Sequence, residues 1–355
     1  MLPAPPTVHS MKSTYLFRLL LALCAGGALL PAVAQPPAQG VAPVSVPVSP
    51  PAGERTVGEW LMRLHEASRQ RAYLGTFVVS SASGALSSAR IWHVCDGEQQ
   101  MERVETLTGV PRSTFRRNDQ VVTFLPESRV ARTEKRESLG LFPNLLKSGD
   151  HAIPEFYSVR QTGSDRVAGF DADIVQFVPR DALRFGYRLW SEKRTGLVIK
   201  LQTLDAAGHV LEQAAFSELQ LDAPVKMGKL AQMMANTEGY RLEKAEAIKT
   251  TAAAEGWALR SPVPGFRSMS CLKRPGSPGQ AAAEGTVQWI FSDGLASVSL
   301  FVESFDAQRH GAEKNAVTGA THSLTRRVGS YWLTALGEVP PATLRRFAMA
   351  LERTR

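Results

Sequence analysis

The chain has 355 residues, and its 41 basic and 33 acidic side chains give a net charge of +8 at neutral pH. This length accommodates two domains of ordinary size. The moderate basic excess favours anionic partners such as lipid head groups or acidic peptides. The basic residues do not lie in the sequence pattern of a recognition helix or a zinc finger, which excludes nucleic acid as a partner.

The N-terminus carries the pattern of a secretory signal. Lys12 and Arg18 precede an apolar stretch over residues 19–30, and a run of small residues ends at Ala34. The apolar stretch is shorter than the roughly 20 residues that a permanent membrane helix needs. We therefore expect residues 1–34 to form a signal peptide that is cleaved after Ala34.

A Pro-rich segment follows the signal peptide. Residues 35–55 have no apolar periodicity, which predicts an extended tether. The first helix is predicted to begin at Thr56, because Thr56 and Glu59 have the spacing of a capping box. Apolar residues then recur at helical spacing and predict one buried face, namely Val57, Trp60, Leu61, Leu64 and Ala67.

Short segments of alternating apolar and polar residues come next, separated by turn sequences such as Asp96-Gly97 and Thr195-Gly196. Short strands at near-regular spacing indicate an antiparallel meander. A sheet of about ten twisted strands has to curl, so we expect a first domain over residues 56–221 that forms a large, half-open β-barrel. The predicted strands are 73–80, 86–95, 99–106, 112–117, 121–125, 157–162, 173–178, 184–191, 197–204 and 209–219.

Two other segments differ from this pattern. Glu137–Gly149 is apolar at helical spacing and includes Phe142, which predicts a helical loop that acts as a lid or plug. Residues 222–256 contain a helical piece at Met227–Met234 and then a run rich in Ala, Lys and Glu. Because this run has little to bury, we predict a linker between two domains.

Residues 257–355 predict a smaller C-terminal α+β domain. Apolar alternation on both sides of Asp293-Gly294 indicates a hairpin, and further strands are expected at Thr321–Val328 and Ser330–Glu338. Pro341 opens a final helix whose buried face consists of Leu344, Phe347, Ala348 and Leu351. The predicted fold class is therefore α+β with mostly antiparallel β structure.

The sequence contains none of the frames that hold a catalytic nucleophile, metal or phosphate, such as H-E-x-x-H or G-x-S-x-G. We predict a binding protein without a cofactor rather than an enzyme. His93 and Cys95 would point to one side of a strand, but a structural zinc takes four ligands, so no metal is expected. Cys95 and Cys271 either form a disulfide or remain two separate buried thiols, and we favour the second reading.

Two sets of residues are candidates for binding. Aromatic and apolar side chains of the first domain could line a lipid cavity inside the curled sheet, although each is also compatible with an ordinary core: Trp60, Phe77, Val79, Trp92, Phe124, Phe142, Tyr187 and Trp190. The densest basic cluster could contact an acidic partner or form a solvated face, and contains Arg116, Arg117, Arg129, Arg132, Lys135 and Arg136.

Several segments, taken in order, resemble the RseB/MucB family of regulators of the envelope-stress sigma factor. The resemblance spans residues 56–351. It is looser in the first domain and dense in the second, where it includes Pro264-Gly265-Phe266, Phe291-Ser292-Asp293-Gly294-Leu295 and the segment Gly337–Thr343. In the first domain it includes Tyr73–Phe77, Arg188-Leu189-Trp190 and Asp205–Gly208.

The resemblance implies a periplasmic protein whose first domain is similar to the lipoprotein carriers LolA and LolB, a half-open barrel with helices in its mouth. It also implies that the chain binds the periplasmic part of a membrane-spanning anti-sigma factor of the RseA/MucA type, protects it from regulated proteolysis, and releases it when lipid or lipopolysaccharide binds. A plain lipid or lipoprotein carrier and a hydrolase are the rival readings, and the sequence leaves homo-oligomers open.

Overall fold

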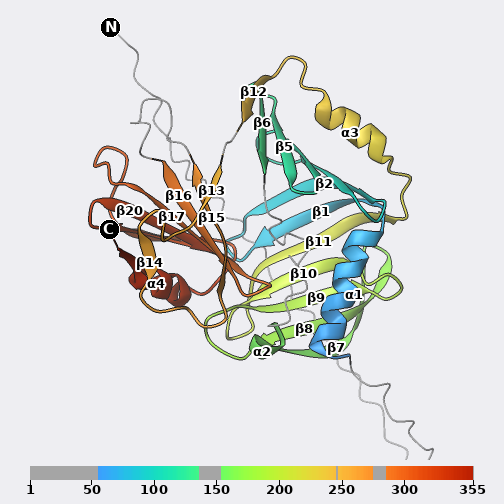
Figure 1. Ribbon diagram of the computed structural model, residues 1–355. Helices are drawn as coiled ribbons and strands as arrows, with labels where there is room; N and C mark the ends of the chain where they lie inside the picture. Colours follow the sequence, from blue (N-terminus) through green and yellow to red (C-terminus); the bar gives the residue numbers. More distant parts are fainter. Residues whose placement is uncertain (1–54, 136–152, 245–246, 275–284, 355) are drawn as a thin grey trace, which may run out of the picture. The chain divides into compact units, whose positions relative to one another are not determined.

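The computed structural model describes residues 55–135, 153–244, 247–274 and 285–354. Residues 51–355 cluster as one compact unit. Two large antiparallel sheets dominate it, one of twelve strands and one of seven (Figure 1). Among the described residues, no helix combines the length and the apolar character that crossing a bilayer requires.

The twelve-stranded sheet has the order β12-β6-β5-β4-β3-β2-β1-β11-β10-β9-β8-β7. All neighbours run antiparallel except β12 and β6, which are parallel. Its two end strands, β12 and β7, are not paired with each other among the described residues, so the described sheet is not a closed barrel. The strands are Tyr73–Ser81 (β1), Leu86–Cys95 (β2), Gln100–Thr106 (β3), Ser113–Arg117 (β4), Gln120–Leu125 (β5), Val130–Lys135 (β6), Tyr157–Val167 (β7), Phe170–Pro179 (β8), Gly186–Glu192 (β9), Val198–Leu204 (β10), Val210–Leu221 (β11) and Arg241–Lys244 (β12).

Three helices accompany this sheet: α1 (Val57–Gln70), α2 (Ile153–Phe156) and α3 (Met227–Ala235). The capping box forms as expected, because the Thr56 hydroxyl accepts from the Glu59 N–H while the Glu59 carboxylate accepts from the Thr56 N–H. The apolar face of α1 is buried through Trp60, Leu61 and Leu64. Helix α1 contacts β2 and β7, whereas α3 contacts β3 and β4.

The seven-stranded sheet has the order β13-β15-β16-β17-β20-β19-β18. Helix α4 (Pro341–Ala350) packs on β19 and β20, and a short pair of strands, β14 (Trp257–Leu259) and β21 (Leu351–Arg353), lies beside it. The strands of the sheet are Ile248–Thr250 (β13), Arg267–Arg274 (β15), Thr286–Ser292 (β16), Ser297–Ser304 (β17), Lys314–Thr318 (β18), Thr321–Val328 (β19) and Tyr331–Gly337 (β20).

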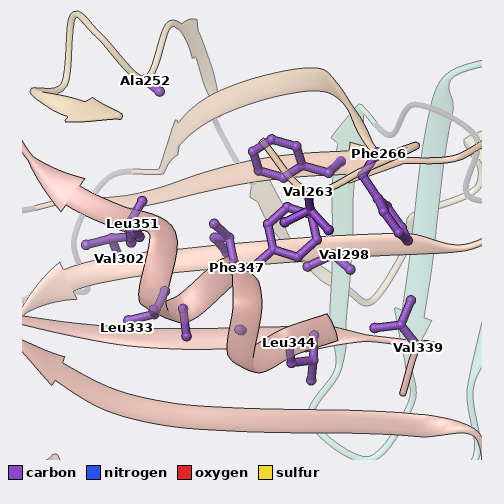
Figure 2. Packing of buried hydrophobic residues seen from close by; sticks show 14 of the residues in the cluster. Ala252, Val263, Phe266, Val298, Val302, Leu333, Val339, Leu344, Phe347 and Leu351 are labelled. Atoms are coloured by element: carbon purple, nitrogen blue, oxygen red, sulfur yellow. The ribbon is translucent and has the colours of Figure 1, made fainter. Parts of the chain in front are cut away.

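The core of this second sheet forms where strand alternation meets the helix. Val298 and Leu300 of β17 and Leu333 of β20 are fully buried. Leu344 and Phe347 of α4 point toward these strands, as Figure 2 shows. The predicted hairpin around Asp293 and the predicted final helix are thus confirmed.

The strand predictions are confirmed in type, with boundaries shifted by a few residues, but several strands were missed. The run after Met234 does not simply connect two domains, because β12 pairs with β6 of the large sheet and β13 pairs with β15 of the small one. The prediction that this run has little to bury is wrong at Ala252, which lies in the core of the second sheet. The signal peptide, most of the tether and the Glu137–Gly149 loop with Phe142 lie outside the described residues.

Candidate functional site

The predicted lipid-lining residues are placed in three core clusters of the large sheet. Trp60 and Tyr187 share one cluster below α1. Trp190 and the partly buried Phe77 belong to a second. Phe124 and the partly buried Trp92 belong to a third, beneath α3. Val79 is half-buried on β1.

Each of the three tryptophans in this set carries a cation on its ring. The Arg55 guanidinium lies 4.9 Å from the ring centre of Trp60, that of Arg103 lies 4.7 Å from Trp92, and the Lys200 ammonium lies 4.2 Å from Trp190. A cation over the face of an aromatic ring is attracted by the negative charge of that face. Arg103 is itself paired with Glu105 at 2.9 Å, so the positive charge over Trp92 is partly neutralised.

The predicted basic cluster lies at the β12 end of the large sheet. Arg116 and Arg117 are on β4, and Arg117 is exposed and donates to the Gln99 side-chain oxygen at 2.6 Å. Arg129 is exposed in the turn before β6 with a φ of 50°. The cluster spans neighbouring strands of the sheet, but the register places Arg117 beside Gln120 at the start of β5 and Arg129 in the turn after the end of β5.

Part of this positive charge is already neutralised. Arg132 on β6 donates to Glu243 on β12 at 3.0 Å, and Arg241 approaches the other carboxylate oxygen at 2.8 Å. Hydrogen bonding from Arg132 holds the pKa of Glu243 below its ordinary value. Of the predicted set within the described residues, Arg117, Arg129 and Lys135 are exposed cations for which no ion pair to an acid is seen, and Arg136 lies outside the described residues.

His93 lies in the interior, next to an aromatic ring and an acid. His93 is fully buried, its ring stacks on Tyr73 with centres 4.7 Å apart, and its Nδ1 lies 3.5 Å from a carboxylate oxygen of Glu102. Within the part of the chain that the structure describes, no group of three His, Cys, Asp or Glu side chains could hold an ion. Cys95 and Cys271 are both free thiols, so the disulfide alternative is excluded.

Sequence reasoning missed a buried ion pair that connects the two sheets. Arg184, in the loop between β8 and β9, donates from Nη1 to Asp293 Oδ2 at 2.8 Å, and neither side chain is exposed (0% each). Asp293 lies in the turn between β16 and β17, where its Oδ1 accepts the backbone N–H of Leu295 and of Ala296. Tyr157 also donates its hydroxyl to Asp293 Oδ2, at 3.3 Å.

The remaining donors of Arg184 are also used. Nε and Nη2 reach the two oxygens of Asp181 at 2.9 and 3.0 Å, and Nη2 reaches the carbonyl of Pro264 at 2.9 Å. Burial alone would lower the pKa of Arg184, but its hydrogen bonds to Asp181 and the charge of Asp293 outweigh this and raise it. Arg184 therefore stays charged inside the protein, as a guanidinium with its donors satisfied does.

Three segments that carry the family resemblance meet at this loop. Gly265 has a φ of +81°, and a Cβ there would lie 2.6 Å from Arg184 Nη2, so only glycine fits. Asp293 supplies the paired carboxylate. Thr343, at the start of α4, donates its hydroxyl to the carbonyl of Leu183 at 2.7 Å.

These features define a two-sheet, antiparallel β protein with a basic sheet end and a buried charge network that joins the sheets. The family model described as the MucB/RseB N-terminal domain matches residues 56–234, and the one described as the MucB/RseB C-terminal domain matches residues 251–352. The chain belongs to the MucB/RseB family. Curated relatives of the chain are sigma-factor regulatory proteins, and the family is not one of enzymes.

Individual relatives agree with this assignment. The chain is 30% identical over 300 residues to the sigma factor AlgU regulatory protein MucB of Pseudomonas aeruginosa, which covers 82% of this chain and 90% of that protein. It is 22% identical over 293 residues to the sigma-E factor regulatory protein RseB of Escherichia coli K12, covering 82% of this chain and 89% of the relative.

Solved structures show the same fold. The complex structure of Pseudomonas aeruginosa MucA/MucB matches with a TM-score of 0.64 at 24% identity, over 84% of this chain and 99% of that chain. A crystal structure of MucB in complex with MucA(peri) matches with a TM-score of 0.63, over 83% of this chain and 98% of that chain. The arrangement of both sheets is thus shared with a protein that has been crystallised with a partner.

Proposed function

We propose that this protein binds the periplasmic region of a membrane-spanning anti-sigma factor of the RseA/MucA type and protects it from regulated proteolysis. The observation that carries the proposal is the match of both family domains together with the fold similarity to MucB, a protein whose structure was solved with MucA bound. A periplasmic location follows from the same relationship and from the N-terminal export pattern over residues 1–34.

Arg117 and Arg129 are the best candidates among the predicted cations for contacting an acidic segment of the partner. Both are exposed at the β12 end of the large sheet, where Arg132 is occupied by Glu243. Arg116 is half-buried on the same strand as Arg117 and would contribute to the local potential. Rim charges of this kind act mainly on the association rate and on its salt dependence.

The test measures binding of the partner's periplasmic segment to the variants Arg117→Gln and Arg129→Asn, the second of which keeps a residue that tolerates positive φ. We expect slower association and a weaker salt dependence. Arg346→Gln, on the exposed side of α4, is the matched control. Association that is equally fast in all four proteins would remove these arginines from the interface.

The regulatory part of the proposal is release of the partner when lipid or lipopolysaccharide binds. A lipid can weaken partner binding only by the difference in its affinity for the free and the partner-bound forms. The apolar clusters of the large sheet, with cations over Trp60, Trp92 and Trp190, supply the chemistry for such a ligand. A pull-down of the partner segment with and without lipid A tests this, and unchanged capture would reject the lipid trigger.

A lipid or lipoprotein carrier is the second candidate, favoured by the same apolar clusters. Deleting residues 257–355 would not separate the two functions cleanly, because the deletion would strip Asp293 from the buried Arg184. Native mass spectrometry of the full-length protein is the better test. A carrier would retain lipid after purification and would bind it equally well with the partner segment present.

A further inference from the structure

A cavity lies beside the small sheet, between strands β15 and β16 on one side and the segment 249–263 on the other. None of the residues assigned above to lipid or partner lines it. Its volume of about 670 Å³ is in the range of roughly 300–1,000 Å³ that is usual for small-molecule sites. The cavity is therefore large enough for a ligand of its own.

The walls of the cavity are formed largely by aromatic rings. Trp289 and Phe291 of β16 have ring centres 4.7 Å apart. Phe266 and Phe291 each contact Phe347 of α4, at 5.5 and 4.9 Å between ring centres, so contacts behind the wall hold these two rings in place. Rings in stacked or edge-to-face contact attract each other beyond what the buried area alone provides. The aromatic lining residues are Trp257, Phe266, Trp289 and Phe291.

The lining offers no counter-charge to a charged ligand. Its described residues include no acid, and the one basic side chain among them, Lys249, already takes part in an interaction within the protein. Burial raises the pKa of the Cys271 thiol to about 11, so this lining residue is neutral as well. A charged group placed against such walls would lose its hydration without a partner to offset the loss. The lining therefore favours an uncharged ligand.

One polar side chain in the lining lacks a partner. Ser270 is 7% exposed, and its hydroxyl makes no hydrogen bond to any described residue. A buried hydroxyl without a partner loses the hydrogen bonds that it would make in water. The register of β15 against β16 shifts between Ser268 and Ser270, which places a β-bulge at this point, and such bulges re-aim side chains. A ligand hydroxyl that reaches Ser270 would restore the missing hydrogen bond.

From these features we infer that the cavity beside β15 and β16 binds an uncharged aromatic molecule that carries one hydroxyl group. The ring system of the ligand packs against Phe266, Trp289 and Phe291, and its hydroxyl forms a hydrogen bond with the Ser270 hydroxyl. This site is separate from the lipid trigger proposed above, because that ligand was assigned to the apolar clusters of the large sheet.

The probe is 2-naphthol, which is uncharged at neutral pH, and it is added to the full-length protein. Labelling with ¹³C at the methionine methyl groups reports the position of binding. Met269 lines the cavity and is partly exposed, whereas Met349 is exposed on α4 and does not line it. We expect 2-naphthol to shift the Met269 methyl resonance until the site is saturated and to leave that of Met349 in place.

Three analogues with the same carbon skeleton test the assigned chemistry. The compound 2-methylnaphthalene lacks the hydroxyl and should bind roughly 3- to 10-fold more weakly, which corresponds to one hydrogen bond. The anion 2-naphthoate should bind more weakly by roughly tenfold or more, because its charge is placed against apolar walls. Decahydro-2-naphthol keeps the hydroxyl but has no aromatic ring, and its affinity should be lower by roughly 2- to 10-fold.

Variants of the protein decide whether the cavity is responsible. Ala253 is exposed and lines the cavity, whereas the neighbouring Ala254 is also exposed and does not. We expect Ala253→Trp to weaken 2-naphthol binding by roughly tenfold or more, and Ala254→Trp to leave it unchanged. Ser270→Ala should bind 2-naphthol and 2-methylnaphthalene equally well. Lys249→Gln should keep the native affinity for 2-naphthol, because no charge on the ligand is involved.

The absence of a Met269 shift would overturn the inference, as would equal affinity in the two tryptophan variants. Tighter binding of 2-naphthoate than of 2-naphthol would show an anionic ligand, and tighter binding of decahydro-2-naphthol an aliphatic one, and either result would overturn the assigned class. Should Ala253→Trp fail to fold, the analogue series on the native chain and on Ser270→Ala still decides the matter. Loss of partner binding in any of these proteins would bear on the proposed function and not on this site.

Discussion

The sharpest stability prediction concerns the buried pair of Arg184 and Asp293. The substitution Asp293→Asn keeps a side-chain oxygen for the backbone N–H groups of Leu295 and Ala296, so the turn itself is preserved. It replaces the charged acceptor of Arg184 by a neutral amide. The side chains of Arg184 and Asp293 are both fully buried, and Arg184 Nη1 lies 2.8 Å from Asp293 Oδ2. Breaking one side of a buried ion pair costs about 3–5 kcal/mol.

The expected loss for Asp293→Asn lies at the lower end of this range, about 3 kcal/mol, because Arg184 keeps both oxygens of Asp181 and the carbonyl of Pro264. Arg184→Met should cost more, since it leaves a buried carboxylate with only the Tyr157 hydroxyl and two backbone donors. The double variant should be more stable than the sum of the two losses predicts, because it removes both charges together.

These free energies of unfolding are measured by urea unfolding, followed by tryptophan fluorescence and by far-ultraviolet circular dichroism. If the dependence of the unfolding free energy on urea concentration is the same in all variants, a shift of the midpoint reports a loss of stability. Asp306→Asn is the matched control, because Asp306 also caps a turn and pairs with an arginine, Arg309, but at the surface. A loss for Asp293→Asn no larger than that of the control, with strictly additive effects in the double variant, would refute the reasoning.

Three further predictions test other parts of the fold. Gly75→Ala should destabilise the large sheet by about 1–3 kcal/mol, because a Cβ there would lie 2.7 Å from the Glu218 carbonyl and the Phe216 ring. Thermal unfolding measures the loss, and Gly58→Ala, whose added Cβ would lie 4.0 Å from the nearest atom, is the control. Burial raises the pKa of the Glu212 carboxyl in the folded protein. The contribution of Glu212 to stability therefore falls as the pH rises from its pKa in the unfolded chain through its pKa in the folded one. The variant Glu212→Gln should have a higher melting temperature than the native chain at pH 7.5 and lose that advantage at pH 4. Cys271, with a pKa of about 11, should react with a maleimide more slowly than the half-buried Cys95 at pH 8, which peptide mapping can measure.

Local chemistry predicted much of this fold. The capping box of Thr56 and Glu59 and the apolar stripe of α1 depend on residues a few positions apart, so a sequence contains them completely. The same holds for alternation in long strands such as β2, whose predicted bounds are those observed. The predicted number of strands was too low. Strands β12 and β13 are short and their pairing partners lie far away in the sequence. Strands β6 and β15 were missed although each pairs with the next or preceding strand of the chain.

The candidate lipid site shows a different limit. Hydrophobicity identified side chains that are buried, such as Trp60 and Phe124, but it could not assign them to the same space. Their distribution over separate clusters depends on strand order and on which helix covers which strands, and α1 and α3 cover different parts of the sheet. Sequence alternation gives the face of a strand but not its neighbour across the core.

The buried charge network shows where a stronger inference from sequence was available. Asp293 was interpreted only as a turn residue, and one of its oxygens does serve the turn. A carboxylate has two oxygens, and between two apolar strands the second one needs a positively charged or hydrogen-bonding partner. The hairpin therefore implied that a cation or another hydrogen-bond donor comes from elsewhere in the chain, and both Arg184 and Tyr157 do so. Arg184, flanked by Leu183 and Phe185 in the sequence, is the arginine that meets this need, and its requirement for space explains Gly265.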